Sequence, residues 1–122
     1  VDEQLEATIR YPSGLTARFE SSFVVPEMDF TMRITGTSGE AFAHNFCVAS
    51  FDDRITVTVD GVQRVEELGT KTSYTYQLEA FADYLRNGTP IFSDADDAVV
   101  QAEFIDACYT AAGLPLRPTT HL

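Results

Sequence analysis

The sequence is poor in lysine, cysteine, histidine and tryptophan, and these shortages exclude several classes of protein. Lys71 is the only lysine, and the formal net charge is −11. A basic stripe that could bind nucleic acid or anionic lipid therefore cannot form. No stretch approaches the roughly 18 consecutive apolar residues that a membrane-spanning helix requires. We expect neither a nucleic-acid partner nor a membrane partner.

The few cysteines and histidines have no spacing typical of a metal site or a redox motif. Cys47 and Cys108 lie far apart among apolar neighbours, which favours buried free thiols over a disulfide. Free thiols indicate a reducing compartment, so we expect a cytoplasmic protein. His44 lies in a strand-like run and His121 in the C-terminal tail. A structural role for His44 is favoured over a role as ligand or base, and we predict no metal site.

The length and composition are those of one soluble domain. The chain has 122 residues, of which 44% are hydrophobic and 22% charged, so we expect a single domain over residues 1–122. It begins with Val1, and a strand-like pattern starts within a few residues. This beginning favours a fragment or a processed chain over a complete gene product.

The first half of the chain alternates with a period of two residues, which is typical of strands with one buried face. Pro12-Ser13-Gly14 and Asp60-Gly61 are turn sequences that predict antiparallel hairpins. The predicted strands cover residues 4–11, 15–23, 30–35, 40–46, 54–60 and 62–68.

After Gly69 the apolar spacing becomes helical. Thr72 or Ser73 can cap a first helix that ends at Gly88. Its apolar stripe contains Tyr74, Leu78, Phe81 and Leu85, and one face of a second helix contains Ala98, Val99, Ala102, Ile105, Tyr109 and Ala112. The predicted class is α+β, an open antiparallel sheet of about six strands with two C-terminal helices on one face.

Two clusters near the helices are candidate sites. Ser93, Asp94, Asp96 and Asp97 fit a helix cap, because acids stabilise a helix N-terminus and the spacing of a calcium loop is absent. Tyr74 begins the apolar stripe and is expected in the core. By contrast, Tyr76 and Gln77 lie off the stripe and could face a ligand.

The outward face of the predicted sheet is polar and of mixed charge. It is either a solvated face or a self-complementary surface that pairs about a two-fold axis. Its residues are Glu6, Thr8, Arg10, Thr16, Arg18, Glu20, Thr31, Arg33, Thr35, Thr56 and Thr58.

Several segments resemble one protein family. They are EATIRYPSG at residues 6–14, ITGTSGE at 34–40, YTYQLEAF at 74–81, NGTP at 87–90, FIDACY at 104–109 and AAGLPLR at 111–117. Together they resemble the C-terminal domain of the glucose-fructose oxidoreductase, inositol dehydrogenase and MocA family of NAD(P)-dependent oxidoreductases. The closing segment is most similar to the branch of dihydrodiol and xylose dehydrogenases.

The resemblance implies a C-terminal domain of the dihydrodipicolinate-reductase type beside an N-terminal Rossmann domain. NAD or NADP would bind to that Rossmann domain, which also carries the family's catalytic Glu-Lys-Pro motif. Lys71 is followed by Thr72 and does not match this motif. The resemblance therefore implies no catalytic and no cofactor-binding residue in this chain.

The resemblance also implies where substrate and partner subunit would lie. Tyr74, Tyr76 and Gln77 match a segment near the substrate. The open sheet face is implied to form a homodimer through Glu6, Thr8, Arg10, Thr16, Arg18, Glu20 and Arg33. We therefore expect a substrate-side and dimerisation domain of an enzyme that acts on a sugar, polyol or related hydroxyl compound. The alternatives are a freestanding α+β dimerisation module and a small-ligand-binding module without activity.

Overall fold

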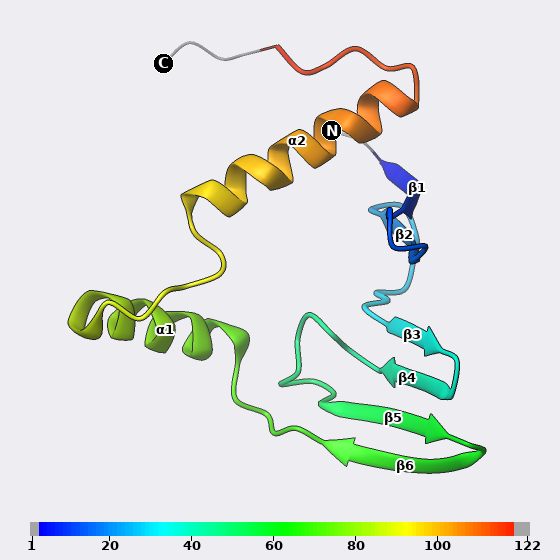
Figure 1. Ribbon diagram of the computed structural model, residues 1–122, viewed down its shortest axis with the longest axis vertical. Coiled ribbons are helices and arrows are strands. Elements are labelled where there is room, and N and C mark those ends of the chain that lie inside the picture. Colours follow the sequence, from blue (N-terminus) through cyan, green and yellow to red (C-terminus); the bar gives the residue numbers. More distant parts are fainter. Residues whose placement is uncertain (1–2, 119–122) are drawn as a thin grey trace. The chain divides into compact units, whose positions relative to one another are not determined.

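The computed structural model describes residues 3–118 and contains six strands and two helices (Figure 1). All strand pairs are antiparallel, so the predicted α+β class is confirmed. The strands form two sheets, of two and four strands, where a single sheet was predicted. The elements are β1 (Gln4–Arg10), β2 (Thr16–Ser22), β3 (Met32–Gly36), β4 (Gly39–Ala43), β5 (Arg54–Val59), β6 (Val62–Glu67), α1 (Ser73–Asn87) and α2 (Ala95–Ala111).

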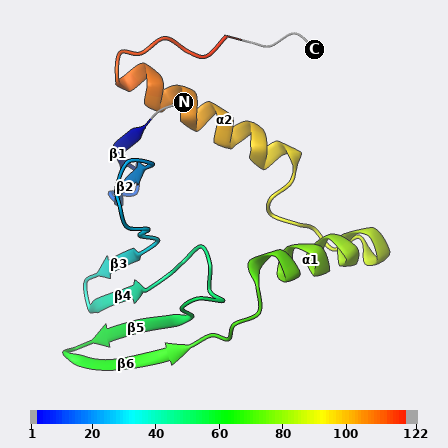
Figure 2. The same ribbon diagram turned by 180° about the vertical axis from the view of Figure 1, so that it is seen from behind.

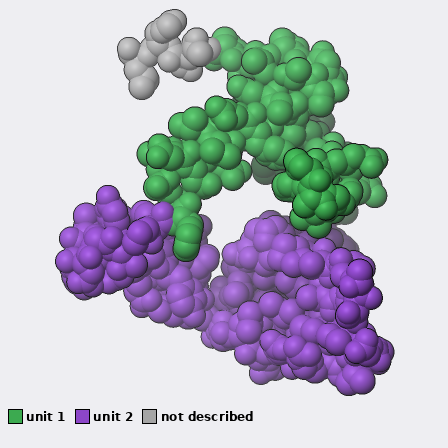
Figure 3. All heavy atoms as spheres, in the orientation of Figure 1, with its two compact units in different colours: residues 1–26, 92–122 green, residues 27–91 purple. Residues whose placement is uncertain are grey.

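The chain forms two compact units, which Figure 3 shows in green and purple. Unit 1 contains Val1–Pro26 and Phe92–Leu122, and therefore β1, β2 and α2. Unit 2 contains Glu27–Ile91, and therefore β3 to β6 and α1. That the whole chain is one domain stays a prediction.

In unit 1, β1 and β2 form the hairpin that the sequence predicts. Gly14 has a φ of 88° in the turn, and the Tyr11 amide donates to the Leu15 carbonyl across it at 2.9 Å. The period-two pattern leaves Leu5, Ala7, Ile9, Ala17 and Phe19 half-buried while their neighbours in the strands stay exposed. One face of the hairpin is therefore apolar and the other polar.

Helix α2 packs against the apolar face of this hairpin. The rings of Phe19 and Phe104 lie 5.9 Å apart in a tilted arrangement. Phe104, Cys108 and Tyr109 are half-buried, whereas Val99 and Ile105 are exposed. The face that the sequence grouped around Val99 and Ile105 is thus not the half-buried side, because apolar residues occur all round α2 and their spacing does not select one side.

In unit 2, β3 to β6 form a meander in which neighbours in sequence are neighbours in the sheet (Figures 1 and 2). Asp60 and Gly61 turn the chain between β5 and β6 with φ values of 50° and 79°, which confirms the predicted tight hairpin. Ala43 of β4, 8% exposed, is the only buried apolar side chain among the described residues.

The two faces of the meander differ in polarity, because residues paired across strands share a face. One face carries Ile34, Ala41 and Val57 from a single register row that ends at Arg64 of β6. The opposite face carries Arg33, Phe42 and Thr56, and Thr35, Glu40 and Thr58 from the next row. The mixed polar face that the sequence predicts is thus present in this sheet.

Helix α1 begins and ends where its capping residues predict. The Thr72 side chain accepts a hydrogen bond from the Thr75 amide at 3.2 Å. Gly88 adopts the left-handed conformation at the C-terminus, with a φ of 71°. The apolar stripe of α1 is exposed, and Tyr74, which was expected in the core, is 76% exposed. That both helices lie on one sheet face stays a prediction.

Candidate functional site

The first turns of α1 hold the three residues that were predicted to lie on the substrate side. Tyr74 begins the apolar stripe, whereas Tyr76 lies two residues later, about 200° round the helix. Gln77 lies between them on the helix circumference. All three side chains are exposed, and none of them lines the hollow beside Leu5 and Tyr109 or the hollow beside Ile34 and Val57. The structure does not bring the three side chains together into one pocket.

Tyr76 has charged neighbours that the sequence did not reveal. The Lys71 ammonium lies 4.3 Å from the centroid of the Tyr76 ring, which is a cation–π contact. The same ammonium forms an ion pair with Glu79. Lys71 precedes the helix by two residues, and helical spacing places Tyr76 and Glu79 on one side of α1.

At the C-terminal end of α1, the Asp83 carboxylate accepts hydrogen bonds from residues that end the helix. The Asn87 amide nitrogen donates to the Asp83 carboxylate. Hydrogen bonds from Thr89 and then Asn87 hold the pKa of Asp83 below its ordinary value, although burial acts in the opposite direction. These contacts account for the conformation of the NGTP segment without a ligand.

The polar face of the β1–β2 hairpin carries six of the predicted dimer-face residues. Three register pairs place them there, namely Glu6 with Glu20, Thr8 with Arg18, and Arg10 with Thr16. The like charges of Glu6 and Glu20 are directly opposite, yet each has a favourable partner. Arg18 forms an ion pair with Glu6 at 2.9 Å, and Gln4 donates to Glu20 at 3.1 Å. The face is therefore mixed in charge and internally paired.

Arg33, the seventh dimer-face candidate, lies on the polar face of the four-stranded sheet. Its guanidinium forms an ion pair with Glu40 at 2.7 Å and stacks 4.7 Å from the centroid of the Phe42 ring. Phe42 in turn meets the edge of the His44 ring, with the centroids 4.9 Å apart. A row of contacts thus runs across β3 and β4 on this face.

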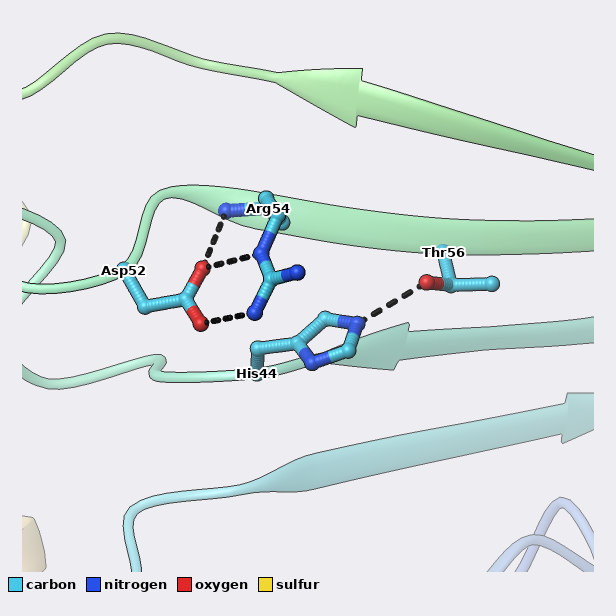
Figure 4. Close-up of polar contacts among 4 residues, drawn as sticks. All are labelled: His44, Asp52, Arg54 and Thr56. Atoms are coloured by element: carbon cyan, nitrogen blue, oxygen red, sulfur yellow. Dashed lines mark hydrogen bonds and ion pairs between the residues drawn. The ribbon is translucent and has the colours of Figure 1, made fainter.

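His44 continues this row into a polar cluster beside the end of β4 (Figure 4). Its Nε2 atom lies 2.9 Å from the Thr56 hydroxyl, and its backbone amide donates to the Arg54 carbonyl. This partnership agrees with the structural role that was favoured for His44. It explains the half-buried position of the ring without a ligand or a metal.

Sequence reasoning missed the ion pair of Asp52 and Arg54 in the same cluster. The two oxygens of Asp52 accept from Arg54 Nε at 2.8 Å and from Arg54 Nη2 at 2.6 Å. The hydrogen bonds from Arg54 hold the pKa of Asp52 well below its ordinary value. An acid two residues before an arginine at the start of a strand was the available signal.

The other titratable clusters have structural explanations. The Asp94 carboxylate caps α2 by accepting from the Asp97 amide at 3.0 Å, so the cap is Asp94 and not Ser93. Cys47 and Cys108 are free, as predicted, but Cys47 is exposed and Cys108 half-buried. Within residues 3–118, no group of three His, Cys, Asp or Glu side chains is placed to bind a metal. His121 lies outside the described residues.

Comparison with known proteins places these features in a family. Residues 1–113 match the oxidoreductase family's C-terminal alpha/beta domain. The chain is 32% identical over 117 residues to D-xylose 1-dehydrogenase (NADP(+)) 2 of Haloferax volcanii. This alignment covers 92% of the chain and 35% of the relative, so the chain spans about a third of that relative's length. No solved structure matches the chain.

Proposed function

Because the chain belongs to the C-terminal alpha/beta domain of the oxidoreductase family that includes glucose-fructose oxidoreductase, inositol dehydrogenase and MocA, we propose that it is the substrate-side and dimerisation domain of an NAD(P)-dependent enzyme. The substrate is a sugar, polyol or related hydroxyl compound. Cofactor binding and hydride transfer belong to an N-terminal Rossmann domain of the same parent enzyme. The family match over residues 1–113 is the observation that carries this proposal.

The xylose dehydrogenase relative supports a sugar as substrate and NADP as a possible cofactor of the parent enzyme. That relative is described as NADP-dependent and acting on D-xylose, and it aligns with 92% of this chain. The aligned part is about a third of the relative, 35% of its length. The remaining length accommodates the cofactor domain that the proposal requires.

The exposed apolar surface of the chain also supports a larger parent. Leu78, Phe81 and Leu85 of α1 are all exposed, and Phe92 after α1 is 98% exposed. An exposed apolar stripe of this kind usually marks a surface that another protein element covers. We assign this covering role to other parts of the parent enzyme.

The polar face of the β1–β2 hairpin supports the dimer part of the proposal. A two-fold interface needs a self-complementary surface, and Glu6 and Arg18 provide charges of both signs on one face. Arg18 on this face and Arg33 on the polar face of the four-stranded sheet each have an acidic partner, so burial of either face leaves its arginine with a counter-charge. We propose a cytoplasmic location, because Cys47 and Cys108 are free thiols and the cytoplasm keeps thiols reduced. No helix among the described residues is long and apolar enough to cross a membrane.

The division of labour between the domains is tested by comparing this chain with the full-length product of its gene. Both are mixed with NAD or NADP and with D-xylose and other sugars, and absorbance is followed in the nicotinamide band. We expect reduction of the cofactor by the full-length protein and none by this chain. Turnover by this chain alone contradicts the assignment of catalysis to the missing domain, and no turnover of any sugar by the full-length protein contradicts the proposed function.

The dimer is tested separately by sedimentation of the full-length protein. Arg18→Glu combined with Arg33→Glu places like charges on the proposed interface, so the variant should sediment as a monomer where the wild type sediments as a dimer. Arg64→Glu is the matched control, because Arg64 lies on the opposite face of the four-stranded sheet from Arg33. A monomeric wild type, or equal dimerisation of all three proteins, counts against the interface.

A further inference from the structure

Helix α1 has a polar side directly opposite its apolar stripe. At 100° per residue, Tyr76 lies about 160° from Leu78 and 180° from Leu85. It lies on the polar side of α1, and Tyr84 lies about 80° from it at the edge of that side. Thr72, Thr75, Glu79, Asp83 and Asn87 complete that side. If the apolar stripe is covered by protein, the polar side with Tyr76 is the side left to meet solvent or a small polar ligand.

Two charged side chains, those of Lys71 and Glu79, lie next to Tyr76. Lys71 places its ammonium 4.3 Å from the ring centroid and pairs at the same time with Glu79. One face of the ring is thus occupied by a cation, yet Tyr76 remains 53% exposed. The ring is held on one side and accessible elsewhere.

We propose that Lys71 is a positioning residue that holds Tyr76 beside Glu79 for contact with the substrate, an inference that rests on the proposed function. A sugar presents C–H groups on the faces of its ring and hydroxyl groups at its rim. An aromatic ring packs against the C–H face, a phenol can donate to and accept from the hydroxyls, and a carboxylate accepts hydrogen bonds from them. Tyr76 and Glu79 supply these groups side by side on one helix.

The charges of the cluster define the class of substrate that fits it. The Lys71 ammonium is matched by the Glu79 carboxylate, so the pair adds no net charge beside Tyr76. A phosphorylated sugar or a sugar acid would meet the Glu79 carboxylate without a free counter-ion in the pair. The cluster therefore favours an uncharged aldose or polyol.

The experiment uses the full-length gene product with D-xylose as the probe. Lys71→Ala should raise the KM for D-xylose about two- to five-fold, the effect expected from the loss of an exposed cation–π contact. The kcat and the KM for the nicotinamide cofactor should change by less than about two-fold, because Lys71 acts on Tyr76 and not on the reacting atoms. Lys71→Arg should restore the wild-type KM, since a guanidinium can both stack on a ring and pair with a carboxylate.

A double-mutant cycle separates positioning of Tyr76 from a general structural role. If Lys71 acts through Tyr76, Lys71→Ala should have no further effect on the KM in a Tyr76→Ala background. Arg64→Ala is the matched control, since it removes an exposed cation paired at 2.8 Å with Glu66 that contacts no aromatic ring in the described structure. If Lys71 had a purely structural role, Lys71→Ala would lower the melting temperature and leave the KM unchanged.

The outcomes distinguish this inference from the proposed function. Turnover of D-xylose with the same KM in wild type and Lys71→Ala overturns the positioning role alone. Independent, additive effects of Lys71→Ala and Tyr76→Ala on the KM overturn it as well. If the wild-type full-length protein turns over no sugar, both the proposed function and this inference are overturned.

Discussion

Gly39 is a position where the backbone itself dictates the residue. A Cβ atom at Gly39 would lie 1.9 Å from the Thr58 carbonyl oxygen and 3.0 Å from the Val59 Cα, both in the backbone of β5. A neighbouring strand cannot move aside as the end of a flexible side chain can, so a larger residue at this position must separate β4 from β5.

We therefore predict that Gly39→Ala lowers the free energy of unfolding by about 2 kcal/mol or more, at the upper part of the range for overpacked sites. Gly36→Ala is the matched control at the other end of the same turn, because the closest atom to its added Cβ is 3.8 Å away. Urea unfolding followed by circular dichroism measures both variants. Equal losses of stability would show that the effect comes from the turn and not from the contact with β5.

Asp52 gives a prediction about pH. Because Arg54 lowers the pKa of Asp52 in the folded protein, the ion pair stabilises the fold above the ordinary pKa of aspartate, about 3.9. This stabilisation is lost as the pH falls below that value toward the lowered pKa. The stability difference between wild type and Asp52→Asn should thus be constant above about pH 5 and should shrink below about pH 4.

Thermal unfolding from pH 7 to pH 3 measures this difference. In an Arg54→Gln background, Asp52→Asn should lose most of its effect at every pH, because the partner that lowers the pKa is gone. A difference that grows as the pH falls has the wrong sign for an ionised Asp52 paired with Arg54, and would contradict the contact shown in Figure 4.

At the scale of whole elements, substitutions in α2 can test which side of this helix is buried. Phe104 packs 5.9 Å from Phe19 of β2, whereas the neighbouring Ile105 is exposed. Phe104→Ala should therefore cost about 1–2 kcal/mol of stability, less than the loss at a fully buried phenylalanine. Ile105→Ala should cost less than about 0.5 kcal/mol. The reverse order, in chemical unfolding, would support burial of the face that contains Val99 and Ile105.

The elements that the sequence predicted well are those that depend on local chemistry. Thr72 and Gly88 fix the ends of α1, and Asp60-Gly61 fixes the turn between β5 and β6, because each acts within a few residues. The cluster of Lys71, Tyr76 and Glu79 was only partly predictable. Tyr76 was identified by its place off the apolar stripe, but its contact with Lys71 depends on how the chain enters the helix.

The features that were not predicted depend on contacts distant in sequence or on ambiguous patterns. The side of α2 that packs on the hairpin could not be predicted from the spacing of apolar residues, because alanine, valine and isoleucine occur on all sides of this helix. The division of six strands into two sheets depends on which strands pair, and period-two alternation is the same for either arrangement.

At the scale of the whole molecule, acidic side chains outnumber basic ones by 19 to 8, which gives the net charge of −11. The five ion pairs among the described residues are all on side chains at least partly exposed to solvent. Exposed pairs each contribute little to stability, about 0–1 kcal/mol. Mutual repulsion of the unpaired acids opposes the compact state and is weakened by salt.

Stability should therefore rise with salt, since screening relieves more repulsion than it removes attraction. We predict a higher urea midpoint at about 0.5 M NaCl than at about 0.01 M, where the Debye length is roughly 30 Å. A neutral osmolyte at matched osmolality is the control for effects other than screening. Glu27→Lys combined with Glu103→Lys reverses two exposed acids and changes the net charge from −11 to −7, so it should reduce the salt dependence. A midpoint that falls with NaCl would mean that the ion pairs, and not the excess of acids, govern the electrostatic stability of the fold.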